Sequence, residues 1–567
     1  MRRFFGFILV IFLLQQVFLS PVVLFAREEV PNNKFGIHIA KPHEEDIIDA
    51  AKLVNGNGGG WGYVTMVMQE DNRDAGAWQN KFDMMRELRL IPIVRIATKP
   101  DGLNWRRPTK EEASEWAEFL HSLRWVTEDR YVIIFNEPNH ATEWGGRVDP
   151  QGYAEVAVAF ATALKEKSPR FRVMLAGLDA SAPSRTPYFE DSGTFLRIVV
   201  ETIGKDRVNQ LFDAFASHSY PNPGFSQAPT RTGKGSVRSY EWELQLLSQL
   251  GVREMPVFIT ETGWDANAIG RVQTAQNLEY AFRNIWLPDH RVQVVTPFIL
   301  NYQDEPFLKF SWRKHQSTEF YPQYTTIQQM EKVVGQPKIV ENGSISFAGF
   351  PSELVEDSKY HFIITLRNTG EGFWHDENGY RLELENTDPR DYLVADLYRI
   401  RPGDSVALDF YFKTGRASAL QERRFVLYNG ERKVLESDVW KYKVLPLPSL
   451  KIQSKLFPKL KTTSDRFELQ IFNESEELVY KRNRIRVVDG VGDIEAIRNI
   501  AYGKTYRIVL LHKGYLPRQT YVTFGLGTNE IIFERMLPFD LDGDGTISFG
   551  DIWQGITRPE ELASYLP

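Results

Sequence analysis

Cysteine is missing from all 567 residues of the chain. Its absence excludes disulfide bridges, zinc sites built on thiolates and a cysteine nucleophile. An excess of positive charge is missing too, because 68 lysines and arginines stand against 74 acidic residues, for a net charge of −6. This balance favours no polyanionic partner, so we expect no nucleic acid ligand.

Long apolar runs are missing everywhere except at the N-terminus. There, Arg2 and Arg3 precede two apolar runs at 4–14 and 17–25, and Ala26 stands before a polar segment. This order is typical of a signal peptide cleaved after Ala26. The two runs together are long enough to span a bilayer, so an uncleaved N-terminal anchor is the alternative. Both interpretations predict a protein that is secreted or held at the cell surface.

Apolar runs alternate with amphipathic helical patterns between residues 34 and 336, and this alternation predicts parallel βα units. Eight strands in about 300 residues match a (β/α)8 or TIM barrel, with a doubly wound sheet as the alternative. The expected strands are 35–39, 63–68, 91–97, 131–135, 172–178, 214–218, 257–260 and 297–300. Helical patterns between them include 111–123, 152–165, 240–250 and 274–286.

The hydrophobic pattern of the sequence changes after residue 337, where short segments of alternating polarity, typical of strands, replace the helical periodicity. Strands such as 359–367, 405–412 and 424–428, separated by turn signals, predict a β-sandwich up to about residue 446. Prolines within 445–448 predict a linker to a second all-β module. Its expected strands include 467–472, 505–512 and 530–533.

Two glutamates stand where expected strands end. The run 131–135 stops at Asn136 and Glu137, and the run 257–260 stops at Glu261. The carboxyl ends of barrel strands form the face that carries the active site in this fold. A single glutamate there is equally consistent with a structural ion pair. Two of them, each in a distinctive short motif, favour paired acid and base chemistry.

The motifs that carry Glu137, after the fourth strand, and Glu261, after the seventh, resemble a known group. Asn136-Glu137-Pro138 and Glu261-Thr262-Gly263-Trp264 are similar to the motifs of the large retaining glycosidase clan of cellulase-like and xylosidase-like enzymes, over residues 34–336. The resemblance implies Glu137 as acid/base, Glu261 as nucleophile, retention of anomeric configuration and no cofactor for catalysis. Retention requires carboxyl groups about 5–5.5 Å apart.

Further residues are candidates for binding the substrate. Asn136 adjoins the acid/base and could hydrogen-bond a sugar hydroxyl. The resemblance implies that His218 and Tyr220, at the end of the sixth strand, position the nucleophile and the sugar. Arg95 lies in an apolar strand, where its charge needs a partner. One hypothesis is that it pairs with Glu261 and keeps the nucleophile ionised, and an equal alternative is that it forms a structural ion pair inside the barrel.

Aromatic residues near the expected strand ends are candidate platforms for sugar rings, with core packing as the alternative. They are Trp264, Trp144, Tyr302 and Trp312. The chain departs from the clan at the eighth strand, where many members have a tryptophan and Tyr302 is the nearest aromatic. His38 on the first strand is expected to be a structural histidine with satisfied hydrogen bonds.

The C-terminal sequence fits a calcium loop. Carboxylates at positions 1, 3, 5 and 12, a backbone carbonyl at 7 and glycine at 6 supply the oxygens and the turn that Ca²⁺ needs. The predicted ligands are Asp540, Asp542, Asp544, Thr546, Ser548 and Asp551. Aspartate at position 12 resembles one dockerin repeat, which implies a cohesin-like or other cell-surface partner. Dockerins have two repeats and only one is found in this sequence, so the alternative is a C-terminal segment that is merely stabilised by bound Ca²⁺.

The β-modules resemble common appendages of secreted enzymes. Asn368, Gly370 and Trp374 form a turn similar to that of Ig-like sandwiches, in which Trp374 packs inside, with sugar binding as the alternative. The second module resembles small transthyretin-like sandwiches. The expected organisation is a signal peptide or anchor (1–26), a barrel (27–336), an Ig-like sandwich (337–446), a second β-sandwich (447–536) and a dockerin-like segment (537–567).

These observations favour an exported retaining glycosidase that acts on a polysaccharide or an oligosaccharide. The alternative from another class is a non-catalytic carbohydrate-binding or surface adhesion protein built on a degenerate barrel. Intact Glu137, Glu261, Asn136, His218 and Tyr220 favour the enzyme.

Overall fold

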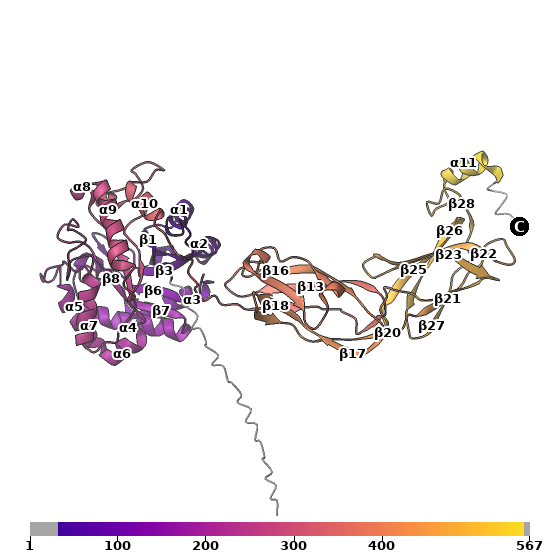
Figure 1. The fold of residues 1–567 in the computed structure, drawn as a ribbon, viewed down its shortest axis with the longest axis horizontal. Coiled ribbons are helices and arrows are strands. Elements are labelled where there is room, and N and C mark those ends of the chain that lie inside the picture. The colour runs from indigo at the N-terminus through magenta and orange to yellow at the C-terminus, as the bar shows by residue number, and fades with distance from the viewer. Residues whose placement is uncertain (1–31, 561–567) are drawn as a thin grey trace, which may run out of the picture. The chain divides into compact units, whose positions relative to one another are not determined.

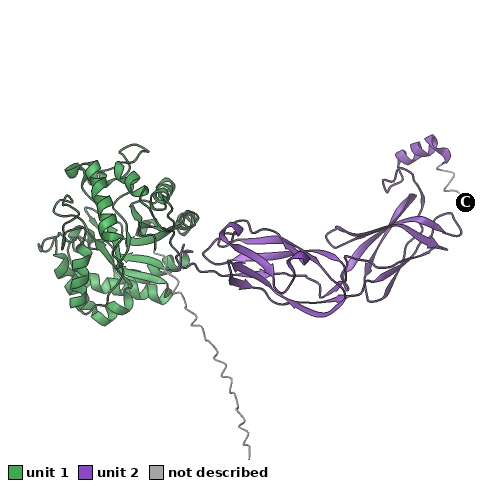
Figure 2. Ribbon diagram, in the orientation of Figure 1, with its two compact units in different colours: residues 1–123, 129–337 green, residues 124–128, 338–567 purple. Residues whose placement is uncertain are grey.

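The structure, a computed structural model, describes residues 32–560 and divides into two compact units (Figure 2). Among the described residues, one unit contains 32–123 and Asp129–Pro337, and the other contains Arg124–Glu128 and 338–560. The predicted signal or anchor at 1–26 lies outside the described residues. Within 32–560, no helix is long and apolar enough to cross a membrane.

The first unit is a (β/α)8 barrel, as predicted (Figure 1). All neighbouring strands pair in parallel, and a parallel bridge between Phe35 and Val295 joins the first strand to the last. In sheet order the strands are β1 (Gly36–Ile39), β2 (Gly62–Gln69), β3 (Leu90–Ala97), β6 (Arg130–Ile134), β7 (Phe171–Leu175), β8 (Ala214–His218), β9 (Val257–Glu261) and β10 (Val292–Val295).

Helices cover the outside of the barrel, so the strands are buried on both faces and read as continuous apolar runs. Local signals set the helix starts: Asp149 accepts a hydrogen bond from the Gly152 N–H at 2.9 Å, and Pro150 follows this cap. The helices are α1 (Glu44–Val54), α2 (Ala75–Glu87), α3 (Ala113–Ser122), α4 (Pro150–Lys167), α5 (Ser192–Ile203), α6 (Lys205–Leu211), α7 (Ser239–Gln249), α8 (Ala266–Ile269), α9 (Arg271–Ala281) and α10 (Pro322–Gln328).

The predicted eighth strand at 297–300 is wrong, because the last strand is β10, at Val292–Val295. Residues 297–300 are apolar for another reason. Phe298 and Ile299 pack with Tyr220 and Phe310 in a buried cluster. Their backbone N–H groups donate to the carbonyls of Thr262 at 2.9 Å and Phe310 at 3.4 Å. The segment also bonds to β1 at His38, whose N–H donates to the Pro297 carbonyl at 3.0 Å and whose carbonyl accepts from the Leu300 N–H at 2.9 Å, but these bonds do not extend into a regular strand.

The second unit begins with a β-sandwich around one hydrophobic cluster. Trp374 is fully buried in this cluster, so it packs the core and offers no face to a sugar. Three sheets contribute, with β11 (Gly343–Ser346), β13 (Lys359–Asn368), β16 (Ser405–Lys413) and β15 (Tyr392–Val394) in the first, β12 (Glu353–Val355), β20 (Trp440–Leu445) and β17 (Ser418–Arg423) in the second, and β14 (Tyr380–Leu384), β18 (Phe425–Asn429) and β19 (Arg432–Glu436) in the third.

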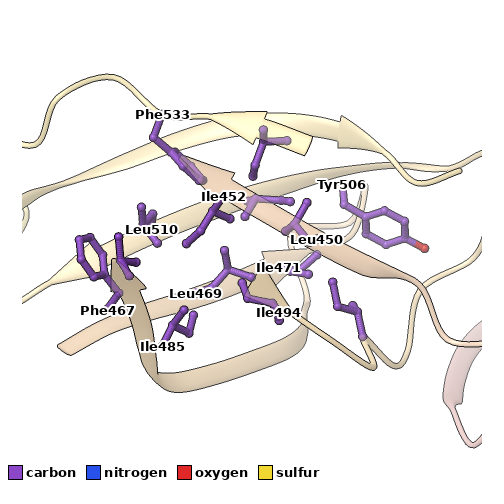
Figure 3. Close-up of a cluster of buried hydrophobic side chains, with 14 of the residues drawn as sticks. Leu450, Ile452, Phe467, Leu469, Ile471, Ile485, Ile494, Tyr506, Leu510 and Phe533 are labelled. Atoms are coloured by element: carbon purple, nitrogen blue, oxygen red, sulfur yellow. The ribbon is translucent and has the colours of Figure 1, made fainter. Parts of the chain in front are cut away.

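The next module surrounds a second hydrophobic cluster, in which Leu450, Ile452, Leu469 and Leu510 are fully buried (Figure 3). Its strands are β27 (Thr528–Ile532), β21 (Ser449–Gln453), β24 (Val491–Ile494), β23 (Leu478–Val488), β22 (Ser464–Phe472), β25 (Thr505–His512), β26 (Gly514–Thr523) and β28 (Pro538–Asp540), in sheet order. A loop then leads into α11 (Phe549–Thr557).

Candidate active site

Glu137 and Glu261 line one cavity of about 260 Å³ at the carboxyl ends of β6 and β9. Glu261 is the last residue of β9, so a regular strand positions it. Glu137 lies in a sharp turn after β6, where Phe135 has φ 68° and Glu137 has φ 32°. Such left-handed backbone is uncommon outside glycine and is found where side chains must be aimed at a site. The Glu137 N–H donates to the Gly177 carbonyl at 3.1 Å and holds this turn against the next strand.

The two carboxyl groups lie close together. One oxygen of Glu137, one of Glu261 and a ring nitrogen of His218 all lie within 4.8 Å of one another. The ring nitrogen Nδ1 of His218 lies 2.7 Å from Glu137 Oε1 and 3.8 Å from Glu261 Oε2. The structure therefore brings together both predicted catalytic residues and one predicted binding residue. His218 is nearer to the acid/base candidate than to the nucleophile candidate.

Glu261 is held by donors on both oxygens. The Arg95 guanidinium donates to Oε1, and the Tyr220 hydroxyl donates to Oε2 at 3.0 Å. Burial alone would raise the pKa of Glu261, but the charges of His218 and Arg95 outweigh burial and lower it. Arg95 is thus the ion-pair partner predicted for Glu261. The carboxylate remains ionised over the whole neutral pH range.

Asn136 connects Arg95 to a third carboxyl group. Its Oδ1 accepts from Arg95 Nη1 at 2.7 Å, and its Nδ2 donates to Glu143 Oε2 at 3.2 Å. Burial and the neighbouring charge of Glu137 raise the pKa of Glu143 to about 7. The sequence-based prediction missed Glu143, because it lies in a short 3-10 helix, Ala141–Glu143, and not at a strand end.

Close packing fixes the position of His218. A Cβ placed on Gly177 would lie 2.2 Å from His218 Cδ2, much closer than any non-bonded contact allows. Gly177 follows β7 and leaves the imidazole the space it occupies. Burial would lower the pKa of His218, but the charges of Glu261 and Glu137 raise it, so the ring is readily protonated beside them.

The aromatic predictions need correction. Trp264, Trp144 and Trp312 are at most 2% exposed, and the Trp264 indole N–H donates to the Gln227 carbonyl at 2.8 Å. They are core residues and cannot stack on a sugar. Tyr302 is half-buried and lines a neighbouring cavity. The missed aromatic is Trp105, which comes from the short hairpin β4 (Pro100–Asp101) and β5 (Asn104–Trp105) and lines both cavities.

His38 also differs from expectation. It is buried beside Glu261, with Nε2 at 3.8 Å from Oε1 of that residue. Among residues 32–560, neither ring nitrogen of His38 has a hydrogen-bond partner. The prediction of a satisfied structural histidine is therefore wrong. Burial, reinforced by the charge of Arg95, lowers the pKa of His38 to about 3 and keeps the ring neutral.

The predicted calcium loop brings three of its carboxylates together. Asp540, Asp542 and Asp544 each offer an oxygen, and these oxygens lie within 4.8 Å of one another. Gly543 and Gly545 have φ of 80° and 87°, which the tight turn requires. Burial and the charges of Asp551 and Asp544 raise the pKa of Asp540. This donor set fits Ca²⁺.

The remaining predicted ligands have other partners in this loop. Asp551 Oδ1 accepts from the Leu541 N–H at 2.7 Å, and its Oδ2 accepts from the Ser548 N–H at 2.6 Å. Ser548 caps α11, and the Thr546 hydroxyl donates to Asp544 Oδ1 at 2.8 Å. Asp551 Oδ1 also accepts from the Asp542 N–H at 3.2 Å, so both of its lone pairs are engaged and Asp551 would have to bind a cation through Oδ2.

Comparisons with known proteins give similarity in fold only. No protein-family model matches the sequence, and no curated protein matches it. The chain is similar to a glucosidase from Croceicoccus marinus, at 10% identity over 84% of this chain and 94% of that chain, with a TM-score of 0.40. It is also similar to AbfB, a family 51 α-L-arabinofuranosidase from Bifidobacterium longum, at 12% identity over 68% and 95%, with a TM-score of 0.34.

A third similar structure is a family 5 xyloglucanase from Paenibacillus pabuli, at 13% identity over 53% of this chain and 98% of that chain, with a TM-score of 0.33. Such low TM-scores carry no argument about activity. The fold and site define a TIM-barrel protein with paired carboxylates at its strand ends, and any function must be argued from that site.

Proposed function

We propose that this protein is a retaining glycoside hydrolase that cleaves a polysaccharide or an oligosaccharide. The observation that carries the proposal is the spacing of Glu137 and Glu261, which each place an oxygen within 4.8 Å of the other in one cavity. Retaining enzymes hold their two carboxyl groups about 5–5.5 Å apart, whereas inverting enzymes hold them about 6.5–9.5 Å apart to admit a water.

Glu261 is the nucleophile in this proposal. Its carboxylate attacks the anomeric carbon and forms a glycosyl ester as the bond from that carbon to the leaving oxygen breaks. Arg95 and Tyr220 donate to its two oxygens and orient it, and the lowered pKa keeps it ionised. Its burial suits a group that meets only the sugar ring.

Glu137 is the acid and then the base. It gives a proton to the leaving oxygen in the first step, and it takes a proton from the water that cleaves the ester in the second. His218 lies 2.7 Å from its Oε1 and can orient it in both steps. The side chain of Glu137 is more exposed than that of Glu261, as access for a leaving group and a water requires.

The rest of the chain fits an exported enzyme. We propose that residues 1–26 direct export or anchor the protein, and that the segment from 537 binds Ca²⁺ through Asp540, Asp542 and Asp544, with Asp551 completing the set. Three clustered carboxyl oxygens support the cation site. A cohesin-like partner or another cell-surface partner for this segment is proposed from the dockerin-like pattern alone.

The experiment is a turnover screen with aryl glycosides and plant and microbial glycans, run on the unmodified protein, Glu261→Gln and Glu70→Gln. Glu70 is a matched control, because it follows β2 and pairs with Arg106 but lies outside the cavity. We expect turnover in the unmodified protein and in Glu70→Gln, and a loss of about 10⁴-fold or more in Glu261→Gln. Full activity in Glu261→Gln would refute the assignment, and glycan binding without any turnover would favour an adhesion protein.

A further inference from the structure

A second cavity, of about 310 Å³, adjoins the carboxylate cavity. The two cavities share five lining residues, which are Val67, Arg95, Trp105, Phe298 and Phe307. We propose that the second cavity is a subsite for a sugar unit that carries an anionic group, so that the substrate is an acidic glycan. This inference rests on the proposed glycosidase activity and names the substrate class for it.

An unpartnered side chain in its wall points to a ligand. His38 lines the second cavity, is 1% exposed and has no hydrogen-bond partner for either ring nitrogen among the described residues. Buried polar groups without partners are rare and costly in native proteins. A sugar hydroxyl can both donate and accept, so it would satisfy a neutral imidazole once the ring turns its buried nitrogens toward the cavity. The aromatic rings of Trp105 and Tyr302, which line the same cavity, can pack against the faces of a sugar.

The charges of the two cavities are opposite. The carboxylate cavity is lined by Glu137, Glu143, Asp179 and Glu261, with Arg95 and His140 as its basic groups. The second cavity is lined by Lys41 and Lys81, besides Arg95, whose charge is paired with Glu261, and no aspartate or glutamate of residues 32–560 lines it. In a protein of net charge −6, this local sign is not a consequence of overall composition. It is the sign that attracts a carboxylate or a sulfate.

Lys81 is the clearest of these cations. Its ammonium lies 4.5 Å from the centre of the Trp78 ring, and burial lowers its pKa. A half-buried ammonium gains more from an anionic ligand than a fully solvated one. Lys41, which also lines the second cavity, is exposed and adds a second positive charge.

The cavity positions tell which sugar unit would be charged. Glu137 protonates the leaving group, so the leaving group lies on its side of the site. Its neighbours Phe135, His140, Glu143 and Asp179 line only the carboxylate cavity. The second cavity contains neither catalytic carboxylate and extends from Arg95 and His38, on the side of Glu261. The anionic unit would therefore belong to the glycone, the part of the substrate that is transferred to Glu261.

The test measures binding to the Glu261→Gln protein by titration calorimetry. The probes are tetrasaccharides of galacturonate, of a sulfated galactan and of neutral cellulose type. Variants are Lys41→Met, Lys81→Met and the double variant, with exposed Lys110→Met as the matched control, because Lys110 lines neither cavity. Thermal unfolding checks that each variant folds, and Lys41→Met, at an exposed position, keeps the test valid if Lys81→Met does not.

We expect at least one anionic probe to bind about tenfold or more tightly than the neutral probe, with this preference lost in the lysine variants and kept in Lys110→Met. The anionic probe that shows the preference distinguishes a carboxylate from a sulfate. Equal binding of all probes, or a preference that survives in the variants, would overturn the subsite. Turnover by the unmodified protein is measured separately. Activity on neutral glycans without an anionic preference would refute the subsite alone. Lysine-dependent binding without turnover of any glycan would refute the proposed activity alone.

Discussion

Two acidic clusters in this molecule look alike in outline and differ in what compensates their charge. In the barrel, Glu137 and Glu261 lie with His218 within 4.8 Å, and in the C-terminal loop, Asp540, Asp542 and Asp544 are equally close. The barrel cluster has fixed cations of its own, because Arg95 donates to Glu261 and His218 lies between the two glutamates.

The loop cluster receives neutral donors. Its carboxylates accept backbone N–H groups, such as those of Gly543 and Thr546. When side chains of the protein compensate the charge of a carboxylate, that carboxylate stays ionised and free to react. When they do not compensate it, clustered carboxylates form a site for a metal ion. The comparison therefore supports the proposal of a catalytic role for the barrel cluster and a metal-binding role for the loop cluster.

Removing the cation of the barrel cluster should have the largest effect. Arg95→Met takes a donor from both Glu261 and Asn136, and we expect turnover to fall by about 10²- to 10³-fold. Because Arg95 lowers the pKa of Glu261, its loss raises that pKa and moves the acidic limb of the pH–activity profile to higher pH. The profile is measured against Arg106→Met, which breaks a comparable pair with Glu70. An unshifted acidic limb would contradict this role for Arg95.

Displacing the histidine should have the next largest effect. Gly177→Ala places a methyl group against His218, which must move away from Glu137. A displacement of about 1 Å in an active site can cost up to about 10²-fold in rate, so we expect a 10- to 100-fold loss with the fold intact. Gly415→Ala is the control, because Gly415 does not have a positive φ and its added Cβ would meet no atom within 4 Å. Equal activity in both variants would show that His218 is not held by this contact.

Calcium should act on the loop and not on the barrel. At a concentration about 100-fold above its dissociation constant, Ca²⁺ should stabilise the C-terminal module by about 2–3 kcal/mol. Asp542→Asn should abolish this effect, whereas turnover should be unchanged by chelator. The measurements are calorimetric unfolding and activity, each with and without EDTA. Loss of turnover on chelation in the unmodified protein would contradict the prediction that Ca²⁺ acts on the loop and not on the barrel.

The smallest effect should come from Glu143. Burial and the charge of Glu137 raise its pKa to about 7, so the folded state prefers its protonated form. Its contribution to stability is full at acidic pH, below its ordinary pKa, and is lost as the pH rises through 7. Glu143→Gln should therefore unfold at a higher temperature than the unmodified protein above pH 7 and at a similar temperature near pH 4. A constant difference across this pH range would contradict the raised pKa.

The barrel and the closeness of Glu137 and Glu261 could be predicted because both follow from periodicity. Parallel strands buried on two faces give apolar runs, and residues that end such runs share one face of the barrel, which brings Glu137 and Glu261 together. The error at 297–300 shows the limit of this reasoning. That segment is as apolar as a strand because it packs at the top of the barrel.

Arg95, Asn136, His218 and Tyr220 could be predicted beside the pair, but the residues that loops bring to the cavity could not, because their positions depend on how separate loops pack. Glu143 and Trp105 come from loop segments that only the folded barrel brings to the cavity. Trp264 was a candidate platform because of its motif, yet its ring faces the core. His38 was expected to be satisfied, and only the three-dimensional structure shows that its ring nitrogens have no partner in the described chain.

The most direct test of the central claim is to identify the residue that becomes covalently linked to the sugar. The protein is treated with fluorinated glycosides that slow the second step, then digested, and the labelled peptide is sequenced by mass spectrometry. We predict that the sugar is attached to Glu261, in the peptide that contains Thr262, Gly263 and Trp264. A label on Glu137, or turnover of a substrate with inversion of its anomeric configuration, would contradict the account.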